Sequence, residues 1–125
     1  MNTIYHYPSC STCKRALKWL KANDIVLEVK DITKETPSKA ELVQIISNSK
    51  LEVKKFFNTA GKVYKERRLK DVVNSLSIDE AAELLASEGM LIKRPLVVTD
   101  QLVIIGFKED DFKQLMKEEL WTKKD

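Results

Sequence analysis

Two cysteines separated by two residues, Cys10 and Cys13, are the only cysteines in the 125-residue sequence. They lie where a run of strand-forming residues gives way to a helical pattern. A cysteine at a helix N-terminus meets unpaired backbone N–H groups and the positive end of the helix dipole, and both favour the thiolate. We therefore predict that Cys10 is an exposed nucleophile. Cys13, one turn on and on the apolar face, would resolve a Cys10 adduct by forming an internal disulfide.

Other uses of the two cysteines remain open. A zinc site needs four ligands, and His6 is the only further soft donor in the chain, so we expect no metal. His6 itself we interpret as a partly exposed strand histidine rather than a catalytic base. A structural disulfide, or two unrelated buried thiols, would also fit the residue types. A Cys-x-x-Cys pair that opens the helix of a strand–helix–strand unit favours redox chemistry over both.

A second candidate site residue is Arg94, which stands with Pro95 directly before an apolar run. The planar guanidinium of Arg94 suits an oxyanion or the Cys10 thiolate, although an ordinary surface charge is an equal alternative. We expect the backbone of Ser11 and Thr12 to complete the site around Cys10.

The apolar pattern predicts the elements that position these residues. Residues 2–7 and 25–31 alternate and predict two strands, with a helix from Ser11 between them. The apolar positions of that helix share one face: Cys13, Ala16, Leu17 and Leu20. This order predicts a β-α-β unit with parallel strands.

The pattern of residues from about 37 to 90 predicts a helical insertion. One helix begins after Ser38 and another after Ser77, each with a glutamate three residues on, which is the pattern of a capping box. We expect Gly89 to cap the end of the second helix. The residues expected to face inward are Leu42, Ile45, Ile46, Leu51, Val53, Phe56, Phe57, Ala81, Leu84 and Leu85.

The C-terminal part predicts a hairpin and a last helix. Residues 96–99 and 102–107 are apolar runs joined by two polar residues, which predicts antiparallel strands. Residues 109–120 predict a helix whose inward residues are Phe112, Leu115, Met116 and Leu120. The whole is an α/β chain, which we expect to form a single domain over 1–125.

Composition limits the function classes. The chain has 22 basic and 19 acidic residues, a net charge of +3, and this small imbalance predicts no direct DNA binding. No uncharged run reaches the roughly 20 residues of a membrane helix, and the N-terminus has no secretory signal pattern. We therefore expect a cytoplasmic protein with no membrane partner.

The sequence also resembles a known family, the arsenate reductase ArsC/Spx/MgsR family, over nearly its whole length. Four segments carry the resemblance: YHYPSCSTCKRALKWL, FFNTAGKVYKERRLKD, LLASEGMLIKRPLVV and IIGFKEDDF. The family implies a thioredoxin-like fold with a mixed four-stranded sheet and a helical insertion between strands 2 and 3. It implies a redox cysteine at Cys10 and a cis peptide at Arg94-Pro95, with Pro95 packed close to Cys10.

The resemblance implies an arsenate-reductase-like thiol–disulfide oxidoreductase of the branch that carries a Cys-x-x-Cys motif. Glutaredoxin-linked arsenate reductases place three arginines around the active cysteine. One matches Arg94, and the other two fall at or beside Asn58 and Gly106. Asn58 can donate only a neutral hydrogen bond, so we expect it to bind substrate weakly and expect little true arsenate reduction.

The family also suggests the partners of such a protein. The substrate would be a small oxyanion or a thiol or disulfide, with no bound cofactor, and glutathione, glutaredoxin or thioredoxin would supply electrons. The alternative is an Spx/MgsR-like redox-sensing transcriptional regulator, in which the same cysteine pair is a sensor. Such a regulator would bind the C-terminal domain of the RNA polymerase α subunit.

Overall fold

The computed structural model describes residues 2–118. The chain forms two compact units. The first combines the residues up to Lys30 with those from Arg94 onward, and the second spans Asp31–Lys93. The helical insertion expected at about 37–90 lies within the second unit, and the single domain over 1–125 stays a prediction.

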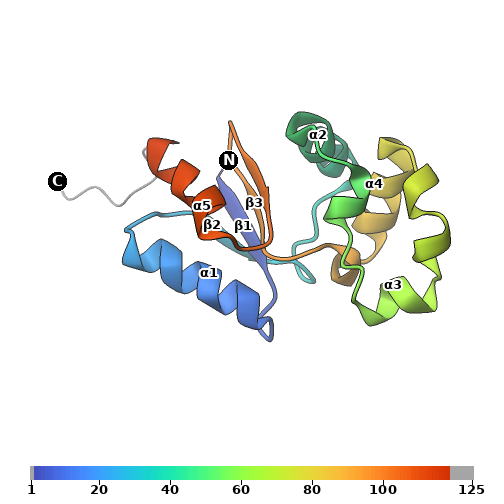
Figure 1. Cartoon of the computed structure of the whole chain (residues 1–125), viewed down its shortest axis with the longest axis horizontal. Helices are drawn as coiled ribbons and strands as arrows, with labels where there is room; N and C mark the ends of the chain where they lie inside the picture. The colour runs from blue at the N-terminus through green and yellow to red at the C-terminus, as the bar shows by residue number, and fades with distance from the viewer. Residues whose placement is uncertain (1, 119–125) are drawn as a thin grey trace. The chain divides into compact units, whose positions relative to one another are not determined.

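A four-stranded sheet in the order β2-β1-β3-β4 forms the centre of the first unit (Figure 1). The strands are β1 Thr3–His6, β2 Glu28–Asp31, β3 Leu96–Val98 and β4 Val103–Ile105. Strand β3 pairs antiparallel with both β1 and β4, so that Ile4, Val97 and Ile104 lie side by side. The mixed sheet of a thioredoxin-like fold and the C-terminal hairpin are thus confirmed.

Helices α1 (Ser11–Ala22) and α5 (Glu109–Phe112) pack together on one face of this sheet. The ring of Trp19 on α1 meets the ring of Phe112 on α5 edge to face, with their centroids 5.7 Å apart. The buried core beneath them contains Ile4, Ala16, Leu20, Ile25, Leu27, Val97, Ile104, Phe112 and Leu115. Burial of this apolar cluster fixes the start of α1 relative to β1.

The last helix differs from its prediction. Helix α5 ends at Phe112, and the chain continues as a 3-10 helix over Lys113–Glu118. Because a 3-10 helix has three residues per turn, Leu115 follows Phe112 into the core and the next residue turns outward. The inward placement of Met116 was therefore wrong, since its side chain is 46% exposed. Leu120 lies outside the described residues.

The second unit is helical. Its α-helices are α2 Lys39–Ser49, α3 Lys62–Glu66 and α4 Ile78–Ser87. Short 3-10 helices lie between and after them, at Val53–Phe56, Leu69–Asp71, Val73–Ser75 and Gly89–Leu91. Both predicted capping boxes are present: Ser38 and Ser77 each accept a hydrogen bond from the backbone N–H three residues on, at 3.1 and 3.0 Å.

Helix α2 packs against α4 around an apolar core. Lys39 joins the two helices on the outside through ion pairs of 3.2 Å to both Asp79 and Glu83. The buried side chains of this unit include Ile32, Leu42, Ile45, Ile46, Phe56, Phe57, Tyr64, Leu69, Val73, Ala81, Ala82, Leu85, Leu91 and Ile92. Most of the predicted inward positions are among them.

Three inward predictions in this unit differ from the structure, and the first of them, Val53, is only half-buried. Leu51 is 39% exposed, because α2 ends at Ser49 and Leu51 lies in the turn that follows it, where no helical face directs it inward. Leu84 is only half-buried, and Ala82 takes the buried position on α4 instead.

Gly89 does not cap α4 as predicted. The helix ends at Ser87 with Glu88 as its C-cap, and Gly89 begins the 3-10 helix that follows. A Cβ atom on Gly89 would overlap the backbone carbonyl oxygen of Ile32 and lie 3.0 Å from its carbonyl carbon. Glycine is required here because two backbone segments approach closely.

We predict that Gly89→Ala lowers the free energy of unfolding by about 1–3 kcal/mol, since backbone atoms must move to admit the methyl group. Gly61→Ala is the matched control. A Cβ there would lie 2.7 Å from the amide nitrogen of the Asn58 side chain, which can rotate away, and 3.1 Å from the Asn58 carbonyl oxygen. Because the closest atom can move and the backbone contact is longer than at Gly89, the loss should be smaller. Urea denaturation of the two variants measures the difference. Equal losses would contradict the packing argument.

Candidate active site

Cys10 lies at the N-cap of α1, as predicted. Its backbone N–H donates a 2.9 Å hydrogen bond to the carbonyl of Tyr7, which closes the turn after β1. Its extended backbone, with φ −84° and ψ 114°, directs the side chain back over the first turn. There the Cys10 Sγ accepts a 3.2 Å hydrogen bond from the backbone N–H of Cys13.

The surroundings of Cys10 favour its thiolate. Partial burial acts to raise the pKa of this thiol, but four other influences outweigh it. Hydrogen bonds from the side chain and backbone of Cys13, the positive charge of Arg94 and the backbone N–H of Thr12 all stabilise the anion, so the pKa is lowered from its ordinary value. Cys10 is half-exposed, so this thiolate is accessible.

Cys13 has the opposite character. Its side chain is fully buried, and burial together with the hydrogen bond to Cys10 raises the pKa of the Cys13 thiol to about 12. Both cysteines are free thiols in this structure. The pair therefore holds one accessible thiolate and one buried thiol within a single helical turn.

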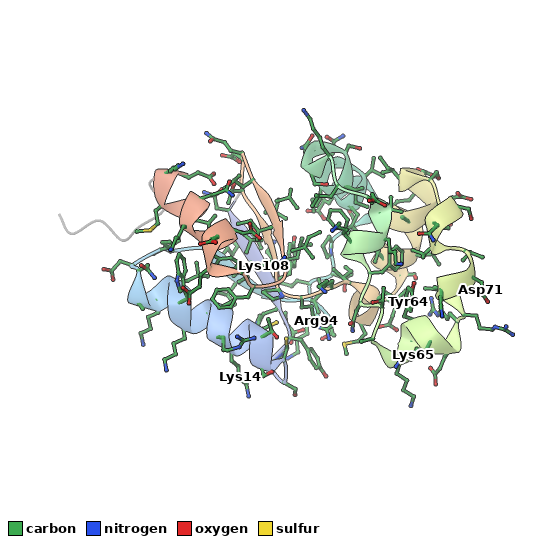
Figure 2. The ribbon with its side chains drawn as sticks, in the orientation of Figure 1. Lys14, Tyr64, Lys65, Asp71, Arg94 and Lys108 are labelled. Carbon is green, nitrogen blue, oxygen red and sulfur yellow. The ribbon has the colours of Figure 1, made fainter. Side chains whose placement is uncertain are left out.

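Arg94 lies beside these cysteines in the first unit, and its side chain is drawn in Figure 2. Its guanidinium stands over the Tyr7 ring, 5.4 Å from the centroid. Its charge favours the thiolate form of both cysteines, although burial keeps the net pKa of Cys13 raised. The Arg94-Pro95 peptide bond is cis, as the resemblance implied. Pro95 is buried, and its carbonyl accepts a 2.9 Å hydrogen bond from Gly106, whose φ is 77°.

The remaining candidates are placed as follows. Thr12 contributes its backbone to Cys10, whereas Ser11 is the exposed first residue of α1. Asn58 belongs to the second unit, where its backbone N–H donates to the carbonyl of Leu91 at 2.7 Å. The substrate-binding roles of Ser11, Thr12, Pro95 and Asn58 stay predictions.

Tyr7 is a site residue that sequence reasoning missed. Its carbonyl holds the Cys10 N–H, and its ring supports the Arg94 guanidinium. Its position three residues before the first cysteine, directly after a strand, is the signal that could have identified it.

Within residues 2–118, no cluster of three or more His, Cys, Asp or Glu side chains could hold a metal ion. No helix in this part of the chain is long and apolar enough to cross a membrane.

The opposed pKa values predict selective alkylation. We expect iodoacetamide to modify Cys10 at least about a hundredfold faster than Cys13 at neutral pH, because only the thiolate reacts. The Cys10 rate should rise with pH and reach its plateau at a lower pH than the rate of an ordinary free thiol, whose pKa is about 8.5. Peptide mapping by mass spectrometry separates the two sites. Equal rates at both cysteines would contradict the assignment.

The contact between Tyr7 and Arg94 predicts that substitutions at these two residues raise the pKa of Cys10 to different degrees. Arg94→Ala should raise the Cys10 pKa because a stabilising positive charge is lost. Tyr7→Leu should raise it by up to about 0.7 of a unit, since an exposed cation–π contact contributes about 0.5–1 kcal/mol. Tyr7→Phe keeps the aromatic face and should resemble the parent.

The measurement is the pH dependence of thiolate absorbance, recorded in a Cys13→Ser background. Tyr7→Leu added to Arg94→Ala should have no further effect. An additive shift would show that Tyr7 acts independently of Arg94.

Known proteins resemble this chain over nearly its full length. It is 47% identical over 112 residues to the uncharacterized protein YusI of Bacillus subtilis (strain 168), covering 90% of this chain and 95% of YusI. It is 30% identical over 115 residues to the regulatory protein MgsR of the same strain, covering 92% and 90%. The crystal structure of a possible arsenate reductase from Streptococcus mutans UA159 matches with a TM-score of 0.82 and 47% identity, covering 88% and 96%. The model of the ArsC family matches residues 5–115, and with the Cys-x-x-Cys site at the head of α1 the chain belongs to the ArsC family.

Proposed function

We propose that the chain is a thiol–disulfide oxidoreductase in which Cys10 is the nucleophile and Cys13 the resolving thiol. One observation carries the proposal: within one turn of α1 the pKa of Cys10 is lowered while that of Cys13 is raised to about 12. A stable structural pair would need no such division. By contrast, a nucleophile that has to react before its resolving thiol requires this difference in pKa.

In the first step the Cys10 thiolate attacks one sulfur of a substrate disulfide. The new bond joins Cys10 to that sulfur, and the other substrate sulfur leaves as a thiolate. Arg94 and the N-terminus of α1 hold the charge on Cys10 before the attack.

The second step follows from the same contacts. The negative charge of Cys10 and the hydrogen bond to its sulfur both raise the pKa of Cys13, and both are lost when Cys10 becomes a mixed disulfide. Cys13 then loses its proton more readily and attacks the Cys10 sulfur, releasing the second substrate thiolate. The protein is left with a Cys10–Cys13 disulfide, having given two electrons to the substrate.

A dithiol donor must then reduce the internal disulfide. Thioredoxin, or glutaredoxin with glutathione, supplies two electrons by the same exchange chemistry and fits this role.

The test is multiple turnover of a peptide disulfide with thioredoxin or glutaredoxin as donor. Turnover should fall to the uncatalysed rate in Cys10→Ser. In Cys13→Ser, before any donor is added, the reaction should stop as an adduct on Cys10, because no resolving thiol is present to release it. Turnover retained by Cys10→Ser would refute the proposal.

Arsenate is a separate question within the proposed function. Arg94 and the helix N-terminus offer donors to an oxyanion, but the positions matched to two further arginines hold no cation. We predict arsenate reduction weaker by about a thousandfold or more than a three-arginine site would give, since several kcal/mol of charge-assisted bonding is missing. Robust arsenate turnover by the unmodified protein at sub-millimolar substrate would contradict the need for the missing cations.

A redox-sensing regulator is the second candidate function, and the 30% identity to MgsR over 92% of the chain favours it. In that role the Cys10–Cys13 disulfide would change affinity for the C-terminal domain of the RNA polymerase α subunit. Calorimetric titration of that domain with oxidised and reduced protein separates the two functions, because an oxidoreductase without this role would show no binding in either state.

A further inference from the structure

The exposed side of α1 carries a stripe of positive charge that begins beside the redox pair. Lys14, Lys18 and Lys21 recur at intervals of four and three residues and so share one face of the helix, and all three are exposed. Figure 2 shows Lys14 extending from the N-terminal end of α1, away from the sheet. We call these three residues the lysine stripe.

Positive charge is concentrated on this helix. It holds four of the 22 basic residues, the stripe and Arg15, and none of the 19 acidic ones, so the rest of the chain has a net charge of −1. Arg15 is also exposed, and its guanidinium stands 5.9 Å from the centroid of the Phe107 ring.

The stability of α1 accounts for Lys21, which lies in the last turn where the helix dipole favours a cation, but not for the N-terminal part of the stripe. Lys14 and Lys18 are like charges four residues apart, which repel each other on a helix surface. Lys14 and Arg15 also lie near the positive end of the helix dipole, where cations are unfavourable, and the first turn has no acidic residue. An external anionic partner would make this clustering of positive charge near the N-terminus of α1 favourable.

We propose that the lysine stripe docks the acidic surface of a protein whose reactive cysteine is flanked by carboxylates, and that it guides that cysteine to Cys10. The inference rests on the proposed function, because exchange requires the partner sulfur to reach the Cys10 sulfur. The stripe starts one turn from Cys10 and runs for about 10 Å, a length that suits a small protein surface.

A protein is favoured over a nucleic acid as the occupant. The stripe begins one turn from the Cys10 thiolate, which exchanges with sulfur, and a nucleic acid offers no sulfur to exchange. Charge complementarity would act mainly on the rate at which the partner and the stripe meet. The rate advantage of an acidic partner should therefore shrink as added salt screens the charges.

The test uses two synthetic peptides of equal length, each with one cysteine activated as a mixed disulfide with 2-thiopyridine. Aspartates flank the cysteine in one and lysines in the other. Attack by Cys10 on the peptide sulfur forms the protein–peptide disulfide and releases pyridine-2-thione, which is followed by absorbance. Each rate is divided by the rate with 2-mercaptoethanol, which removes the intrinsic reactivity of the peptide.

At low salt we expect the acidic peptide to react about tenfold faster than the basic one, and at 1 M salt we expect the ratio to approach one. Lys14→Glu/Lys18→Glu should abolish or invert this preference. The ratio does not depend on the Cys10 pKa, since both peptides meet the same thiolate. Lys113→Glu/Lys117→Glu makes an equal charge change on the segment after α5 and should keep the preference.

Equal rates for the two peptides at low salt, with Cys10 still reactive, would overturn the docking proposal and leave the oxidoreductase proposal intact. Thione release retained in Cys10→Ser would instead overturn the function on which it rests. Binding of a short DNA duplex that is lost in Lys14→Glu/Lys18→Glu, without a peptide preference, would assign the stripe to nucleic acid and overturn the proposal.

Discussion

The hydrogen bond from the Cys13 backbone N–H to the Cys10 Sγ, 3.2 Å long, is the interaction on which the chemistry of this chain depends. It gives one sulfur an N–H donor that a helix start would otherwise leave without an intrahelical partner. The buried side chains of Ile4 and Ala16 hold β1 and α1 in place around it. The core of the first unit therefore positions the site as well as stabilising the fold.

Arg94 adds charge to this arrangement from a distant part of the sequence. The sheet brings it to the cysteines because β3, which begins at Leu96, pairs directly with β1. Tyr7 then supports its guanidinium from the loop that leads to Cys10. A thiolate at a helix start is thus combined with a cation from the turn before β3, which suits both disulfide exchange and redox sensing.

What could be predicted from the sequence depended on residues close together in the chain. The N-cap position of Cys10 and the capping boxes at Ser38 and Ser77 involve partners three residues apart, so the local pattern revealed them. The inward placement of Met116 failed because the pattern does not distinguish an α-helix from a 3-10 helix. The close approach of Gly89 to Ile32 and the contact of Tyr7 with Arg94 join residues that only the folded chain brings together.

The central claim is that Cys10 reacts first and Cys13 completes the reaction. The most direct measurement is the mass of the protein after treatment with one equivalent of glutathione disulfide. The account predicts that the parent loses two hydrogens and keeps no glutathione, that Cys13→Ser carries one glutathione on Cys10, and that Cys10→Ser is unmodified. A parent protein that retains glutathione, or a Cys10→Ser variant that acquires it on Cys13, would contradict the account.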